Sequence, residues 1–262
     1  MNNKTLSVSQ EQVGVVSICL NRPEIHNAFD DVLIADISRE LAIIAEDKTV
    51  RVVILRSAGK SFSAGADLSW MQRMAGYSYE ANLADAEALA AMLNQLNSLP
   101  QITIARVQGA AFGGAVGLAA CCDIVIASER ASFCLSEVKL GLLPATISPY
   151  ISAAIGPRAC RRYFASGERF TAERAQELGL VSEMVSAEDL DQHIFNLADL
   201  LLKNGPEAIV QAKQLAFTVA DRAIDAELVA ETSALIANVR VSPEGQEGLS
   251  AFLEKRAPDW QQ

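Results

Sequence analysis

Two hydrophobic patterns follow one another in the first fifty residues. Apolar and polar side chains alternate over residues 4–20, which predicts a β-hairpin with its turn near Gln12–Gly14. After the polar stretch NRPEIHNAFD, Asp30 or Asp31 is expected to cap a helix, because apolar residues then recur at helical spacing, at Leu33, Ile37, Leu41 and Ile44.

Short apolar strands then alternate with helical stretches. The sequence predicts buried strands over 50–57, 101–109 and 123–128, a further extended piece over Ser132–Glu137, and helices over 83–96 and 113–120. A helix capped at Thr171 should end at Gly179 and lead into another strand. Strands this short and apolar are typical of a sheet covered on both faces, so the expected fold class is α/β.

The last quarter of the chain has a different pattern. From Ala187 to Trp260 every stretch is helical in period, with breaks expected at 206–207 and 242–243, where Pro follows a polar or small residue. We therefore expect an α/β core over residues 1–200 and a helical carboxy-terminal region over residues 201–262.

Composition excludes several classes of protein. Half of the 262 residues are hydrophobic and 21% are charged, which excludes a disordered chain. The net charge of −10, with no cluster of basic residues beyond the short patch Arg158–Arg162, argues against a nucleic-acid partner. No apolar run is long enough to cross a membrane, and the start of the chain lacks an apolar signal core, so a cytoplasmic location is expected. Two histidines without metal-ligand spacing predict no metal site, and five cysteines without a CxxC pair predict reduced thiols.

Two strand–loop–helix transitions carry the candidate chemistry. SFSAGADLSWM (61–71) and GAAFGGAVGLAACCD (109–123) both place small residues after a strand, where the backbone can approach a ligand closely. Gly113 and Gly114 stand at a helix start, where N–H groups lack intrahelical partners. Each loop alone could be a packing turn. Together they predict an oxyanion hole, in which each donor lowers the barrier by roughly 3 kcal/mol.

Several motifs resemble, in order and spacing, those of the enoyl-CoA hydratase/isomerase (crotonase) superfamily. They are FSAGADL, GAAFGG…GLAACCDI, F…SEVKLGLLP and AQELGLVSEMV, followed by the ending EGLSAFLEKRAPDW. The resemblance implies a spiral of ββα units whose helical carboxy-terminal region builds trimers or hexamers. It also implies that the N–H groups of Ala66 and Gly114 bind the thioester oxygen of an acyl-CoA substrate, and that coenzyme A enters with the substrate, so that no separate cofactor is needed.

The same resemblance identifies the expected acid/base. Many hydratases of this family carry two glutamates. The first falls on Gly117 here and is missing, whereas the second falls on Glu137. Its neighbours Leu135, Val138 and Leu140 are apolar, so Glu137 is expected to lie among apolar groups with a raised pKa.

A single glutamate leaves the reaction open. It can move a proton between two carbons, as an isomerase does, or protonate the α-carbon while another group holds water. Features around Asp67–Met74 and Leu140–Tyr150 resemble the branch that hydrates 3-methylglutaconyl-CoA or isohexenylglutaconyl-CoA, in leucine or acyclic-terpene breakdown. The substrate's second carboxylate is then expected to position water, with Ser148, Thr146 or Ser136 as alternatives. An inactive acyl-CoA binding protein is a further alternative.

The remaining site residues follow from the resemblance. Glu24, Ile25, His26, Ala64, Leu68 and Gly113 are expected to bind coenzyme A and substrate, with the adenine near Ala64. Phe252 and Lys255 are expected to reach the coenzyme A of a neighbouring subunit, and Lys255 has an ordinary exposed lysine as its alternative. Trp70 and Met71 are expected to line the acyl pocket, with core packing as their alternative. Ser136–Lys139 also matches the SxxK pattern of serine acyl-enzymes, but the companion motifs of that class are absent.

Overall fold

The computed structural model describes residues 5–261, which divide into two compact units. The first unit runs to Phe195 and the second begins at Asn196. The dividing point lies within helix α7 (Leu190–Leu202), and the boundary expected at residue 200 falls in the same helix. Each unit is described by itself below.

A six-stranded sheet forms the centre of the first unit. Its strands lie in the order β1 (Leu6–Gln12), β2 (Val15–Leu20), β3 (Val52–Ser57), β4 (Ile102–Val107), β6 (Ile124–Ser128) and β9 (Glu183–Val185). Strands β1 and β2 form the predicted antiparallel hairpin, and every other neighbouring pair is parallel. Nearly every residue of β3 and β4 is buried, as expected for parallel strands with both faces covered.

A second, smaller sheet contains β5 (Ala110–Phe112), β7 (Ser132–Cys134) and β8 (Arg169–Thr171). From β4 to β7, consecutive strands alternate between the two sheets, since β4 is followed by β5 and β6 by β7. Two single-residue parallel bridges, between Ser63 and Ala111 and between Phe29 and Ala66, bring two further segments to the small sheet. Each segment lies just before a helix, so successive ββα units place their strand–helix junctions side by side.

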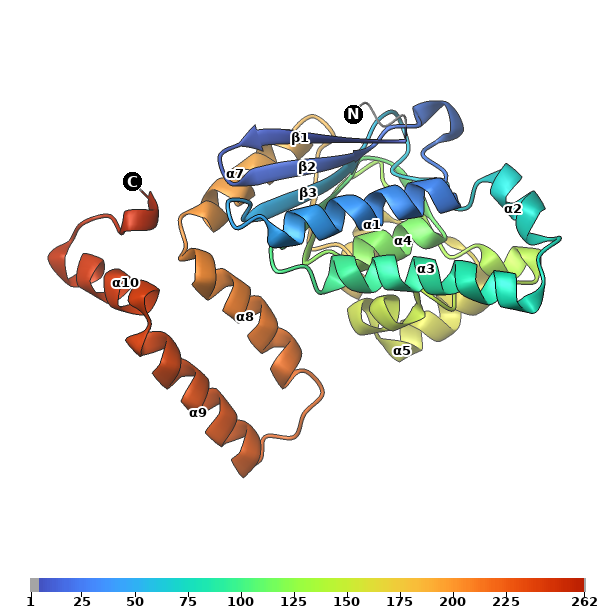
Figure 1. Cartoon of the computed structure of the whole chain (residues 1–262). Coiled ribbons are helices and arrows are strands. Elements are labelled where there is room, and N and C mark those ends of the chain that lie inside the picture. The colour runs from blue at the N-terminus through green and yellow to red at the C-terminus, as the bar shows by residue number, and fades with distance from the viewer. Residues whose placement is uncertain (1–4, 262) are drawn as a thin grey trace. The chain divides into compact units, whose positions relative to one another are not determined.

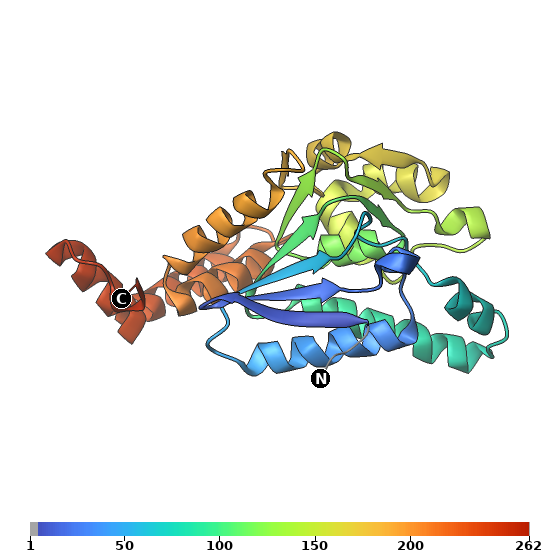
Figure 2. The ribbon, with the colours of Figure 1, turned by 90° about the horizontal axis from the view of Figure 1, so that it is seen from above.

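Helices cover the large sheet in the first unit. Helices α1 (Asp31–Glu46) and α3 (Tyr79–Asn97) lie side by side on one face of the sheet (Figure 1 and Figure 2). Helix α4 (Gly114–Cys121) packs between α3 and α5 (Ser148–Ser166). The short helices α2 (Leu68–Met74) and α6 (Ala172–Leu178) complete this unit, and Thr171 and Gly179 cap α6 as predicted.

The second unit is helical. It contains α8 (Pro206–Val219), α9 (Ala226–Val241) and α10 (Pro243–Glu254), with α10 packed on the other two, and a final turn over Asp259–Gln261. The breaks predicted at 206–207 and 242–243 are confirmed, because Pro206 and Pro243 each open a helix. Across the described part of the chain, none of the helices has the length and hydrophobicity needed to cross a membrane.

Three predictions from the sequence need correction. The extended piece predicted over Ser132–Glu137 ends at Cys134, and Glu137 instead begins a 3-10 turn over Glu137–Leu140 that Gly141 terminates. The helix predicted over 83–96 begins earlier, at Tyr79, because Ser78 caps it. The helical stretch after Ala187 has an additional break between Val219 and Ala226.

Candidate active site

The loop that carries Ala66 is held from both sides by backbone hydrogen bonds. On one side, the Ser63 N–H donates to Ala110 O (3.1 Å) and the Phe112 N–H donates to Ser63 O (3.0 Å). On the other side, the Phe29 N–H donates to Gly65 O (2.7 Å) and the Asp67 N–H donates to Phe29 O (2.6 Å). These four bonds fix the loop between two segments that are distant in the sequence.

The second pair of bonds determines where the Ala66 N–H points. In this parallel bridge, Phe29 makes both bonds, with the residues before and after Ala66, so the Ala66 N–H faces away from Phe29. The Ala66 N–H accordingly has no partner among residues 5–261, and Ala66 itself is exposed. It is a free, oriented donor.

The second expected donor lies at the start of α4. Gly113 adopts φ 54° and ψ −125°, a conformation that only glycine readily adopts, and its N–H donates to Cys134 O (2.8 Å). Gly114 is the first residue of the helix, and within the described chain its N–H has no acceptor. The two loops contact each other, because a Cβ on Gly113 would lie 3.9 Å from the Gly65 Cα. Gly65 and Gly113 thus contact each other, and the free N–H groups belong to the residues that directly follow them, Ala66 and Gly114.

Glu137 lies beside Gly113, the residue that precedes the second donor. Its Oε1 would be 3.2 Å from a Cβ on Gly113, and its Oε2 is buried without a hydrogen-bond partner among the described residues. Burial raises the pKa of the Glu137 carboxyl, because removal from water disfavours the charged form. Among the neighbours that suggested this environment, Leu135 is fully buried, whereas Leu140 is 60% exposed and does not contribute.

The position of the missing second acid is occupied by another side chain. Gly117 lies one helical turn after Gly113 on α4. A Cβ on Gly117 would lie 2.7 Å from the Ile147 Cβ and closer still to its Cγ2, so Ile147 packs against the bare backbone of α4. A side chain at residue 117 is therefore excluded unless Ile147 moves.

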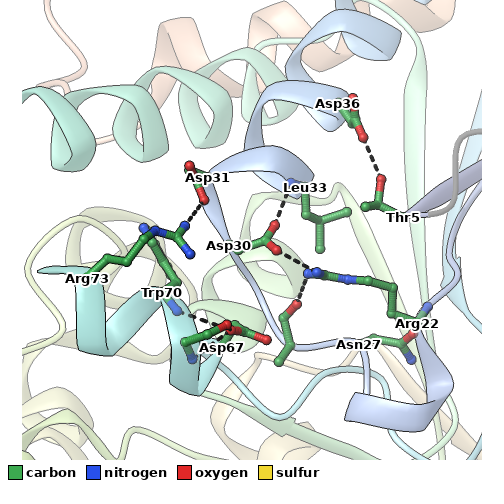
Figure 3. Close-up of polar contacts among 12 residues, drawn as sticks. Thr5, Arg22, Asn27, Asp30, Asp31, Leu33, Asp36, Asp67, Trp70 and Arg73 are labelled. Carbon is green, nitrogen blue, oxygen red and sulfur yellow. Dashed lines mark hydrogen bonds and ion pairs between the residues drawn. The ribbon is translucent and has the colours of Figure 1, made fainter.

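A buried asparagine ties the amino-terminal loop to the Ala66 loop. The side-chain amide of Asn27, 1% exposed, donates to Ala58 O (2.8 Å) and Ser61 O (3.1 Å), and its oxygen accepts from the Arg22 N–H (2.9 Å). The Arg22 guanidinium in turn pairs with Asp30 (2.5 Å), which caps α1, and donates to Ala28 O (Figure 3). This network holds Phe29, the bridge partner of Ala66.

We expect Asn27→Ala to lower both stability and turnover. It removes the three hydrogen bonds of a buried side chain, and it places alanine at φ 53°, where asparagine is tolerated better. A loss of about 2 to 4 kcal/mol, or a melting temperature lower by about 5 to 10 °C, should result. Asn82→Ala is the matched control, because the Asn82 amide also donates to two backbone carbonyls but is exposed. Equal melting temperatures for the two variants would contradict this role.

The predicted coenzyme A residues of the first unit lie on two adjoining segments. Glu24 and Ile25 form a 3-10 turn that ends at His26, whose carbonyl accepts from the Ala64 N–H (2.9 Å) and whose Nδ1 lies 3.1 Å from Ser61 Oγ. Ala64 and Leu68 are exposed on the same loop and the start of α2. The structure thus brings these five residues into one surface region.

Trp70 is placed differently. It is 5% exposed within the core, and its Nε1 donates to Asp85 Oδ1 (3.2 Å) on α3, while Asp67 caps its helix (Figure 3). Its position agrees with the core-packing alternative. In the second unit, Phe252 is 80% exposed on α10, and Lys255 ends that helix at φ 55°.

Of the candidate water-positioning residues, Thr146 and Ser148 flank Ile147, whereas Ser136 directly precedes Glu137. Ser148 Oγ donates to Ala145 O (2.8 Å) and retains its acceptor lone pairs. The hydroxyls of Thr146 and Ser136 are half-buried and have no partner in the chain from Thr5 to Gln261. The Lys139 side chain packs against Gly167. This packing accounts for the lysine of the SxxK match without an acyl-enzyme role.

Comparisons with known proteins agree with this geometry. Residues 10–262 match the family Enoyl-CoA hydratase/isomerase. An enoyl-CoA hydratase structure from Shewanella pealeana is 48% identical, covers 98% of this chain and 96% of its own, and superimposes with a TM-score of 0.94. AtuE from Pseudomonas aeruginosa is 33% identical over 98% of this chain and 100% of its own, with a TM-score of 0.93. The 2,3-dehydroadipyl-CoA hydratase of Escherichia coli is 33% identical over 97% of this chain and 98% of its own. The chain therefore belongs to the enoyl-CoA hydratase/isomerase family, as an enzyme of the enoyl-CoA hydratase type with the α/β crotonase fold that its motifs predicted.

Proposed function

We propose that this enzyme adds water across the α,β double bond of a branched, carboxylated enoyl-CoA, with Glu137 as its only carboxyl catalyst. The observation that carries the proposal is the buried, unpartnered Glu137 Oε2 beside the two contacting loops that present the free N–H groups of Ala66 and Gly114. A proton-transfer group and an oxyanion site are the two parts that this reaction needs.

The oxyanion site would act on the thioester oxygen. When the oxygen of water bonds to the β-carbon, the electrons of the double bond move to the thioester and form an enolate. Two fixed N–H donors stabilise that charge at no cost of reorganisation, and loss of one such donor typically lowers kcat by about 10²- to 10³-fold.

Glu137 would complete the addition. Its raised pKa favours the protonated carboxyl, which delivers its proton to the α-carbon of the enolate. The water that has added to the β-carbon loses one proton, which returns to the Glu137 carboxylate. One molecule of water is thereby consumed and the glutamate is regenerated.

The carboxylated substrate is supported by a relative and by the missing acid. The name of the E. coli relative, 2,3-dehydroadipyl-CoA hydratase, describes an enoyl-CoA with a second carboxyl group. In this chain, no glutamate stands at Gly117 to hold water, so a carboxylate on the substrate would take that role. Substrates of the 3-methylglutaconyl-CoA or isohexenylglutaconyl-CoA type are enoyl-CoA thioesters that carry such a second carboxylate.

The test is product analysis with crotonyl-, 3-methylglutaconyl- and isohexenylglutaconyl-CoA in ¹⁸O-labelled water. We expect a 3-hydroxyacyl thioester that carries the label, with the highest kcat/KM for a carboxylated substrate. If crotonyl-CoA is the best substrate, the carboxylated class is wrong. If no substrate gains oxygen, hydration itself is wrong.

One observation favours a second candidate, an enoyl-CoA isomerase. A single carboxyl with no second acid at Gly117 is sufficient to take a proton from one carbon and return it to another. The same incubation distinguishes the two functions, because an isomerase yields a shifted double bond and no label.

The coenzyme A moiety would bind along the surface formed by Glu24–His26, Ala64 and Leu68. We further propose assembly into trimers or hexamers, in which Phe252 and Lys255 of one subunit reach the coenzyme A of the next. Large exposed apolar side chains of the second unit support an assembly surface: Ile224 is 90% exposed, Val241 75% and Leu253 77%.

A further inference from the structure

We propose that Ile147 forms the wall of the acyl chamber next to Glu137 and decides how large a substituent on the β-carbon the enzyme accepts. This inference rests on the function proposed above, in which Glu137 meets the α-carbon of an enoyl-CoA.

The first step is the amino-terminal turn of α4. Gly113 precedes the helix with a non-helical backbone, and Gly117 is the fourth residue of the helix. At Gly113, the space that a side chain would occupy is bordered by the Glu137 carboxyl, and at Gly117 it is filled by Ile147. The carboxyl and the isoleucine therefore both lie against the bare backbone at the start of α4.

The second step is the rigidity of Ile147. It is 2% exposed, and its turn is fixed by hydrogen bonds from the Ser148 N–H and hydroxyl to Ala145 O and from the Ile151 N–H to Ile147 O. A β-branched side chain held in this way has little rotamer freedom. The wall is thus apolar and fixed in position.

The third step is what this wall faces. The α-carbon must lie beside Glu137, so the β-carbon and its substituent lie one bond further along. Ile147 fills the side-chain space at Gly117. In family members with two glutamates, the first glutamate occupies this position and is expected to reach the water at the β-carbon. The Ile147 methyl groups would instead contact the β-substituent.

The test measures the ratio of kcat/KM for isohexenylglutaconyl-CoA, with its long β-substituent, to that for crotonyl-CoA, with its β-methyl group. Ile147→Ala should raise this ratio by about tenfold or more, because several carbon atoms leave the wall. Ile147→Val, which removes one methyl group and keeps the fold, should shift it less in the same direction. Gly117→Ala should lower the ratio, because its methyl group pushes Ile147 into the chamber.

Ile44→Ala is the control, since Ile44 is equally buried on α1. It should lower the melting temperature as Ile147→Ala does but leave the ratio unchanged. A ratio that stays constant in all Ile147 and Gly117 variants of an active enzyme overturns this inference alone. Failure of the wild-type protein to hydrate any of the three thioesters of the panel overturns the proposed function, and this inference with it.

Discussion

Replacement of Glu137 by glutamine is expected to lower kcat for enoyl-CoA hydration by about 10²- to 10⁴-fold, the range that general acid–base groups typically contribute. Glutamine has the size of the glutamate but cannot donate a proton to the α-carbon. Because the two N–H donors remain, KM should change little. Steady-state kinetics on the best substrate of the panel would measure both constants. Unchanged turnover would exclude Glu137 as the catalyst.

The same variant tests the environment of this carboxyl. Burial raises the folded-state pKa of Glu137 above its ordinary value of 4.5, so ionisation costs stability in the folded protein alone. Below the ordinary pKa this cost is absent; it grows as pH rises from the ordinary pKa to the folded-state pKa and is complete above the folded-state pKa. Glu137→Gln should therefore melt at a higher temperature than the wild type at pH 7, with the difference vanishing near pH 4. A difference that persists at low pH would mean that packing, not charge, is responsible.

Gly113→Ala is expected to lower kcat/KM by about 10²-fold or more while leaving a folded protein. Alanine is strained at φ 54°, and its methyl group would stand 3.2 Å from Glu137 Oε1. Relief of this contact moves either the carboxyl or the peptide that carries the Gly114 N–H, and misalignment of one oxyanion donor has an effect of about this size.

The control for this substitution lies one residue further on. Gly114→Ala places the same methyl group in open space, with no heavy atom within 4 Å, and at a backbone conformation that alanine adopts without strain. Circular dichroism melts should show a lower melting temperature for Gly113→Ala and an unchanged one for Gly114→Ala. If Gly113→Ala keeps wild-type kcat/KM, the proposed coupling between this glycine and the site is wrong.

Local signals in the sequence were sufficient for most of the fold. Helix α6 could be predicted to its ends because Thr171 and Gly179 satisfy its first and last turns with neighbouring atoms only. The break between α8 and α9 was missed because its stretch, ADRAID, contains neither Pro nor Gly. There, Asp221 takes a left-handed conformation and the Asp225 side chain caps α9, roles that aspartate performs without a distinctive pattern.

The candidate site residues likewise fall into two groups, those that the sequence marks and those that it does not. Glu137, Ala66 and Gly114 could be named in advance because small residues after strands, together with family-like motifs, mark them. Asn27 and Ile147 could not, since their roles depend on contacts with Ser61 and Gly117, about thirty residues away in each case. An isoleucine in an apolar stretch carries no signal that distinguishes an active-site wall from ordinary core, and the wall that we propose is argued from the bare backbone of Gly117 opposite it.

The parallel bridge between Phe29 and Ala66 also bears on how this site can evolve. A donor supplied by a peptide group is independent of the side chain attached to it, and the exposed methyl group of Ala66 takes no part in the bonds that hold its loop. In the proposed site, a substitution at residue 66 would therefore change the surroundings of the thioester without removing the donor. Under this proposal, single substitutions at this position can change substrate preference and leave both N–H donors and Glu137 in place.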